Sequence, residues 1–143
     1  MNNTHIPKKE QINKKWYLIN AKNQNLGRLS TKIALILKGK NNIEYTPHIN
    51  SMNYIIVTNA KHITITGNKK YTKTYKKHSG KPGGLKITTF NEIMKKMPIK
   101  IVETSIKGML PKNTLGRQLF KQLKIYSESS HPHGAQKPEV IIL

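Results

Sequence analysis

The sequence predicts an α/β fold in which helices pack on a small, mostly parallel sheet of about four strands. Two short runs of consecutive apolar residues, at 16–19 and 54–58, are typical of strands covered on both faces. Between them, residues 26–38 place apolar side chains at helical spacing. A strand, a helix and a second strand in this order predict a crossover unit whose two strands run parallel.

The helix predicted at 26–38 ends at Gly39 and has one apolar face. That face consists of Leu26, Leu29, Ile33, Ile36 and Leu37. Residues 40–53 then form a long connector, and connectors of this length are usually functional or mobile.

Shorter elements are expected after the second strand. Residues 61–66 alternate between polar and apolar side chains, which predicts a half-exposed strand, and Gly67-Asn68 indicates a turn. Residues 71–77 are again typical of a strand, and 85–88 of a short one. The loop between them, 78–84, is basic and rich in glycine.

Two successive helices are predicted between 89 and 109. Thr89 and Glu92 match a capping box that opens a helix through Met97. Pro98 starts the next helix. Its expected apolar face consists of Ile99, Val102, Ile106 and Met109.

Residues 107–124 predict a helix end, a sharp turn and an amphipathic helix. Gly108 can take the left-handed backbone that closes a helix, Pro111 blocks continuation, and Thr114 can cap the next helix. The apolar stripe of that helix consists of Leu115, Leu119 and Leu123. The cations around the stripe are Lys107, Lys112, Arg117, Lys121 and Lys124.

The length of 143 residues suits one domain, 1–143. Residues 1–15 are expected to form a basic arm and residues 16–126 the α/β body, with a short last strand at Ile125-Tyr126. Residues 127–143 are expected to form an extended tail, because their two prolines exclude a regular helix.

The charge balance indicates a polyanionic partner. There are 26 lysines and arginines against 6 acidic residues, a net charge of +20 at pH 7. Such an excess of like charge opposes a compact fold unless anions are near, and nucleic acid is the favoured partner. A membrane-surface role is less favoured, because no long basic amphipathic helix with Trp or Phe is present.

The chemistry of an enzyme is missing. The chain has no cysteine and no aspartate, and its six glutamates are scattered. This argues against a cysteine nucleophile, a cysteine-ligated metal and the carboxylate sites of Mg²⁺-dependent nucleases. His131 and His133 resemble a metal pair, but two ligands do not make a site. We therefore expect no catalytic residues, no cofactor, no metal and no small-molecule substrate.

Two loops are candidates for nucleic-acid contact. In the connector, Lys40 can meet a phosphate, and Tyr45 or His48 can stack on an unpaired base. The alternative is an ordinary solvated loop with Tyr45 packed down. In the 78–84 loop the phosphate-loop motif is absent, because Gly80-Lys81 is followed by Pro82. There, close approach of an RNA backbone competes with a simple hairpin turn that needs positive φ.

Several motifs in order resemble the large-subunit ribosomal protein thirteen family, of bacterial type. They begin with KGMLP at 107–111, LGR at 115–117 and LKIY at 123–126. The others are WYLINA at 16–21, LGRLSTKIA at 26–34, GK at 39–40, YTPH at 45–48, YIIVTNA at 54–60, TGNK at 66–69, GG at 83–84 and HPHGAQKP at 131–138. The resemblance implies a three-layer α/β/α fold and a non-catalytic protein that binds large-subunit rRNA early in subunit assembly and supports translation.

The resemblance also implies rRNA contacts at Arg28, Lys38, Lys40, His48, Lys69, Lys107, Lys112 and Arg117. Charge and position add Tyr45, Lys70, Lys76, Lys77, His78, Lys81, Lys121, His131, His133 and Lys137. Ser51-Met52-Asn53 stands where an acidic stretch is common in the family, so no acid is carried over there.

Expected partners are large-subunit rRNA and neighbouring ribosomal proteins, without homo-oligomers or membrane. Composition and the tail motif favour a plastid-encoded protein of the chloroplast stroma, with the cytoplasm of an AT-rich bacterium as the alternative. A nucleoid-type or regulatory DNA-binding protein is the alternative function, since residues 98–123 could form a helix-turn-helix. Against it, Pro111 lies in the turn and the second helix carries leucines that favour burial.

Overall fold

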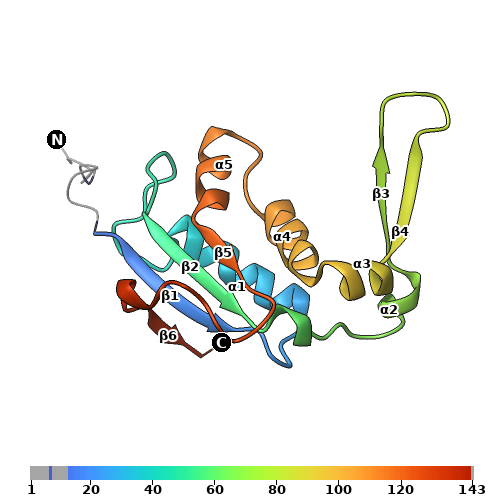
Figure 1. Cartoon of the computed structure of the whole chain (residues 1–143). Helices are drawn as coiled ribbons and strands as arrows, with labels where there is room; N and C mark the ends of the chain where they lie inside the picture. Colours follow the sequence, from blue (N-terminus) through green and yellow to red (C-terminus); the bar gives the residue numbers. More distant parts are fainter. Residues whose placement is uncertain (1–6, 8–12, 143) are drawn as a thin grey trace.

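The computed structural model describes residue 7 and residues 13–142, and a four-stranded parallel sheet lies at its centre (Figure 1). The strands, in order across the sheet, are β5 (Leu123–Ile125), β2 (Asn53–Thr58), β1 (Lys15–Asn20) and β6 (Glu139–Ile141). The predicted α/β class and parallel central sheet are confirmed. The predicted arm, 1–15, lies mostly outside the described residues, and its last residue opens β1.

One face of the sheet is covered by helices α1 (Leu26–Lys38) and α4 (Pro98–Met109) (Figure 1). Successive strand residues point to opposite faces, so Ile55 and Val57 enter the same core as the apolar side of α1. All five residues predicted for that side of α1 are buried. Gly39 ends α1 with φ of 75°, as predicted.

The other face of the sheet is covered by the C-terminal tail. Ile56 points to this face. It is completely buried and does not belong to the core cluster on the helical side. The His133 ring lies 5.4 Å from the Trp16 ring on β1, and a 3₁₀ turn, η3 (Gly134–Gln136), follows it. The tail then returns as β6, parallel to β1. The arrangement is the three-layer one expected, with a thin layer of tail residues on this side.

A second, two-stranded sheet stands away from the body (Figure 1). It is the antiparallel hairpin of β3 (Thr74–His78) and β4 (Leu85–Thr89). The short helix α2 (Lys69–Thr72) precedes it and α3 (Phe90–Lys96) follows it. The predicted capping box of Thr89 and Glu92 is present at the start of α3. Gly80 and Gly83 have positive φ, as the hairpin-turn alternative requires.

Two strand predictions are wrong. Residues 61–66 form no strand: η2 (Ala60–His62) occupies their start, and Thr64 makes only an isolated bridge to Asn25. The backbone N–H groups of Ala60 and Lys61 donate to the tail carbonyls of Tyr126 and Ser127, so the segment is held without a ladder. The strand predicted at 71–77 begins only at Thr74, because α2 occupies the residues before it.

Three details of the predicted 107–124 segment are also wrong. Helix α4 runs through Gly108, and extended Leu110 ends it immediately before Pro111. Helix α5 (Thr114–Lys121) is capped by Asn113 rather than Thr114, with Asn113 Oδ1 accepting the Gly116 N–H at 2.8 Å. Leu123 does not continue the helical stripe; it is buried as the first residue of β5.

The predicted apolar face of α4 is correct at Val102 and Ile106, which are buried, and wrong at Met109, which is 37% exposed. Ile101 is buried although it was not expected to be. Helix α4 packs against α1, α3 and η2 together, so its buried surface is wider than a single stripe.

Candidate nucleic-acid interface

The predicted contact residues lie at the surface, and all of them except Lys38, His131 and His133 are exposed. They fall into three groups. The connector group consists of Lys38, Lys40, Tyr45, His48, Lys107, Lys112, Arg117 and Lys121. The hairpin group consists of Lys69, Lys70, Lys76, Lys77, His78 and Lys81. The tail group consists of His131, His133 and Lys137. Arg28, on α1, is exposed apart from these groups.

The connector group joins two segments that are far apart in the sequence. A cavity of about 190 Å³ lies between the connector and the α4–α5 turn. Its lining residues are Lys38, Lys40, Tyr45, Pro47, Ile49, Pro111, Asn113, Leu115 and Leu119. The Lys40 ammonium lies 6.0 Å from the centre of the Tyr45 ring, within the range of a cation–π contact. Of the predicted RNA contacts, Lys38, Lys40 and Tyr45 line this cavity, and the 107–121 segment contributes uncharged residues to it.

Polar side chains fix the connector to the body. Ser51 Oγ donates to the Leu37 carbonyl at 2.9 Å, and Asn53 Nδ2 donates to the Ile36 carbonyl at 2.8 Å. Both carbonyls belong to the last turn of α1, where helical N–H donors run out, and the Ile36 carbonyl also accepts the Gly39 N–H at 2.9 Å. Ser51 and Asn53 belong to the stretch that lacks the family's acid, and their role here is to hold the connector on α1.

Two further contacts position the connector, and the sequence analysis missed both. Gln122 Nε2, just before β5, donates to Asn50 Oδ1 at 3.1 Å. A Cβ atom on Gly39 would collide with Ser51 Cβ, so the connector passes directly against the end of α1. Only the general need of a helix end for hydrogen-bond donors could have indicated such partners in the sequence.

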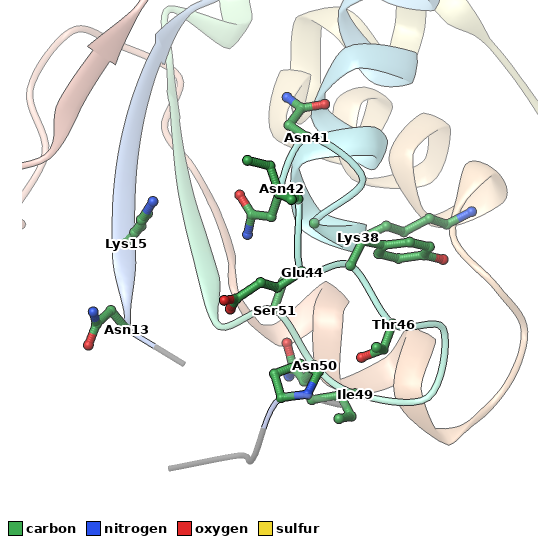
Figure 2. Close-up of a pocket in the computed structure, with 14 residues that line it drawn as sticks. Asn13, Lys15, Lys38, Asn41, Asn42, Glu44, Thr46, Ile49, Asn50 and Ser51 are labelled. Carbon is green, nitrogen blue, oxygen red and sulfur yellow. The ribbon is translucent and has the colours of Figure 1, made fainter. Parts of the chain in front are cut away.

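A larger cavity of about 470 Å³ lies on the other side of the connector, toward β1 (Figure 2). Figure 2 shows Asn13 and Lys15 on the β1 side and the connector residues Asn42 and Glu44 across from that strand. The other lining residues are Pro7, Lys38, Gly39, Asn41, Ile43, Tyr45, Thr46, Ile49, Asn50 and Ser51. Amide side chains both donate and accept hydrogen bonds, so the wall suits ribose hydroxyls and base edges.

The α4–α5 turn is tight because Gly116 has no side chain. A Cβ atom at this position would overlap the carbonyl of Pro111. The close approach sets α5 against the turn and leaves Lys112 and Arg117 exposed. The Lys107 ammonium lies 5.7 Å from the centre of the Phe120 ring, which ties the end of α4 to α5.

The hairpin group divides between the two faces of its sheet. On one face Lys77 lies directly opposite Lys86. This like-charge pair weakens the hairpin unless an anion lies near both ammonium groups. On the other face Lys76 and His78 lie opposite Ile87 and Leu85, which are half exposed. Lys86 was not among the predicted contact residues, and the strand register is what identifies it.

The histidines of the tail group have partners within the chain. His133 Nε2 lies 2.8 Å from the Tyr126 hydroxyl, and His131 Nδ1 accepts the His133 N–H at 3.3 Å. The His133 ring also packs beside Trp16, which stacks on Tyr54 with ring centres 4.5 Å apart. These contacts give both histidines a role in fastening the tail to the sheet, while Lys137 remains exposed.

Neither a metal-binding cluster nor a membrane-spanning helix is found among the described residues. Among residues 7 and 13–142 no three His, Asp or Glu side chains gather as a metal site would require. No described helix is long and apolar enough to cross a membrane. Burial raises the pKa of the Tyr75 phenol above its usual value.

The geometry defines a class of protein: a basic α/β domain that displays cations and aromatic rings from a rigid connector and a projecting hairpin. A family model, ribosomal protein L13, matches residues 14–132. The chain belongs to the ribosomal protein L13 family. Its role is accordingly structural and ribosomal rather than enzymatic.

Relatives match over nearly the whole chain. "Large ribosomal subunit protein uL13" of Acaryochloris marina is 53% identical over 141 residues, which are 99% of this chain and 93% of that protein. The protein of the same name from Prochlorococcus marinus is 51% identical, over 99% of this chain and 94% of its own length. "Large ribosomal subunit protein uL13c" of Gracilaria tenuistipitata var. liui is 55% identical, over 99% of this chain and 98% of its own length.

Proposed function

We propose that this protein binds the RNA of the large ribosomal subunit and supports early assembly of that subunit and translation. The observation that carries the proposal is the cavity between the connector and the α4–α5 turn, which Lys38, Lys40 and Tyr45 line and whose connector wall is bonded to the end of α1. Membership of the ribosomal protein L13 family supports the same conclusion.

Binding would be mainly electrostatic. Lysines that meet phosphates release the counterions condensed on RNA, and this release supplies most of the affinity. The connector group would fix the orientation of the protein, because side chains of the connector bond to the end of α1 and to Gln122 just before β5. The hairpin group would add phosphate contacts at a distance from the body (Figure 1).

We further propose a place for the protein in the cell. It would work on plastid ribosomes, beside neighbouring large-subunit proteins. Support comes from the relatives, which include proteins of cyanobacteria and the uL13c protein of Gracilaria tenuistipitata var. liui. The cytoplasm of a bacterium is the alternative. Cell fractionation of the source organism, with detection in isolated plastids, separates the two.

The RNA-binding proposal is tested by measuring the affinity of the purified protein for transcribed large-subunit rRNA at several salt concentrations. If 6–10 phosphates are met, the affinity should fall by roughly 10³–10⁵ between 50 and 200 mM salt. Duplex DNA in excess should compete poorly. A flat salt response would contradict the proposal, and equal competition by DNA would favour a DNA-binding protein.

A further inference from the structure

We propose that the cavity between the connector and the α4–α5 turn receives one unpaired RNA base, which stacks on Tyr45. This inference rests on the proposed function and makes it more specific, since it adds contact with a base to contact with the RNA backbone. The occupant is a nucleotide: a planar ring in the cavity, with its phosphates at the lysines of the rim.

The size and floor of the cavity suit such a ring. Its volume is about 190 Å³, and an apolar cavity of about 150 Å³ is enough to hold a benzene-sized ring. The apolar lining is contributed by both segments, with Pro47 and Ile49 from the connector and Pro111, Leu115 and Leu119 from the helical one. Leu119 is 2% exposed, so this floor is continuous with the protein core.

The rim of the cavity suits the phosphates of the same nucleotide. Lys38 and Lys40 line the opening and belong to a chain with a net charge of +20. Lys38 also lines the larger cavity on the other side of the connector, so this residue borders both spaces. The base of a nucleotide suits the apolar floor, and the phosphates on either side of that nucleotide suit the cationic rim. A side chain from a neighbouring basic protein would match the floor but not the rim.

Tyr45 is the stacking residue. Its side chain is 37% exposed and lines the cavity, which leaves ring surface for a base. The Lys40 ammonium lies over the ring, 6.0 Å from its centre, so the base would stack on the ring face that Lys40 leaves open. Asn113 Oδ1 accepts the Gly116 N–H, so the amide NH₂ of Asn113 is the group that can donate to an edge of the base.

The experiment compares four forms of the full chain, each bound to transcribed large-subunit rRNA: wild type, Tyr45→Ala, Tyr45→Phe and Ile142→Ala. Tyr45→Ala removes the stacking partner of the base and should lower the affinity for rRNA by roughly 5- to 150-fold. Tyr45→Phe keeps the stack and should bind as wild type does. Ile142 is 95% exposed and lines neither cavity, so Ile142→Ala is the control for loss of an exposed apolar side chain.

The salt dependence separates stacking from charge. Tyr45→Ala should keep the wild-type slope of log affinity against log salt, whereas Lys40→Ala should lower its magnitude by about 0.7 for one lost phosphate on single-stranded RNA. A second measurement is independent of affinity. Ultraviolet cross-linking of the wild-type complex, followed by peptide mass spectrometry, should place a nucleotide on the peptide that contains Tyr45.

The possible failures can be told apart. If wild type shows no salt-dependent preference for rRNA, the proposed function itself is wrong. If wild type binds as expected but Tyr45→Ala binds equally well, or Tyr45→Phe fails to restore binding, the base-binding inference is wrong. Cross-links that occur elsewhere on the chain but not at Tyr45 would contradict it as well.

Discussion

The connector group and the hairpin group are both rich in lysine, but they are built in opposite ways. The connector is held by side-chain hydrogen bonds to the end of α1 and by Gln122, and its cavity has buried leucine in the floor. The hairpin has two strands, exposed aliphatic side chains and a like-charge pair, Lys77 and Lys86, across them. The connector is therefore the more firmly held of the two proposed RNA-binding surfaces, and the hairpin carries a like-charge pair that lowers its own stability.

This difference predicts that stability and binding are coupled at the connector and separate at the hairpin. Substitutions beneath the connector group should unfold the protein and weaken rRNA binding together. Substitutions on the hairpin should change rRNA binding with little loss of stability. The four predictions below test this contrast, in order of decreasing effect.

The largest effect is expected for Leu119→Ala. Leu119 is 2% exposed and lies in the core and in the floor of the small cavity. Removing a buried leucine side chain should lower the free energy of unfolding by about 2–5 kcal/mol, as measured by urea denaturation. Unchanged stability would show that α5 is not held by this side chain.

Gly116→Ala should have the next largest effect. The new Cβ would overlap the Pro111 carbonyl, so α5 must move away from the turn. We expect a loss of about 1–3 kcal/mol in the free energy of unfolding, together with weaker rRNA binding. Gly134→Ala is the matched control, because a Cβ there meets no atom within 4 Å. Equal stability of the two variants would rule out the close approach.

Arg117→Ala should weaken rRNA binding and leave the melting temperature nearly unchanged. Arg117 is exposed on α5, beside the buried residues that hold this helix. Loss of one phosphate contact should lower the magnitude of the salt slope by about 0.7–0.9. A lower melting temperature with unchanged binding would instead make Arg117 a structural residue.

Lys86→Glu should have the smallest effect on stability, and with the opposite sign. A glutamate opposite Lys77 replaces a like-charge pair by an attractive one, which should add about 0.2–1 kcal/mol to the stability of the hairpin. The affinity for rRNA should fall in the same variant. Thermal denaturation and binding, measured side by side, test this opposition. Stability and affinity that fall together would contradict the proposed contrast between the two groups.

The sequence predicted the body of the fold well where patterns were local. The apolar runs of β1 and β2, the face of α1, the capping box at Thr89 and the hairpin loop all follow from nearest neighbours along the chain, and they are confirmed. The resemblance to the ribosomal family also extended over most of the chain, and the family is confirmed.

The failures arise where distant segments decide the structure. Residues 61–66 alternate as a strand does, yet their N–H groups meet the tail and the residues before α1. Leu123 has the spacing of a helical stripe but pairs with Ile55 on β2 instead. β6 and β1 come from opposite ends of the chain and pair with each other, and no local sequence pattern predicts this pairing. Neither could Lys86 be placed opposite Lys77 without the hairpin register.

The candidate site shows the same division. Lysine-rich stretches identified surfaces that carry charge, and all the predicted lysines except half-buried Lys38 are exposed. The meeting of the connector with the α4–α5 turn, and the bonds from Ser51, Asn53 and Gln122 that hold it, depend on tertiary packing. The assignment of individual RNA contacts stays a prediction.

The central claim is that this protein is a component of the large ribosomal subunit, bound through the connector group. Sucrose-gradient sedimentation of a lysate that contains the tagged protein tests it most directly, with a variant in which Lys38, Lys40, Lys112 and Arg117 are alanine. Wild type should sediment with large subunits and whole ribosomes, and the variant should shift to the top of the gradient. Wild type at the top of the gradient, or a variant that still sediments with large subunits, would contradict the account.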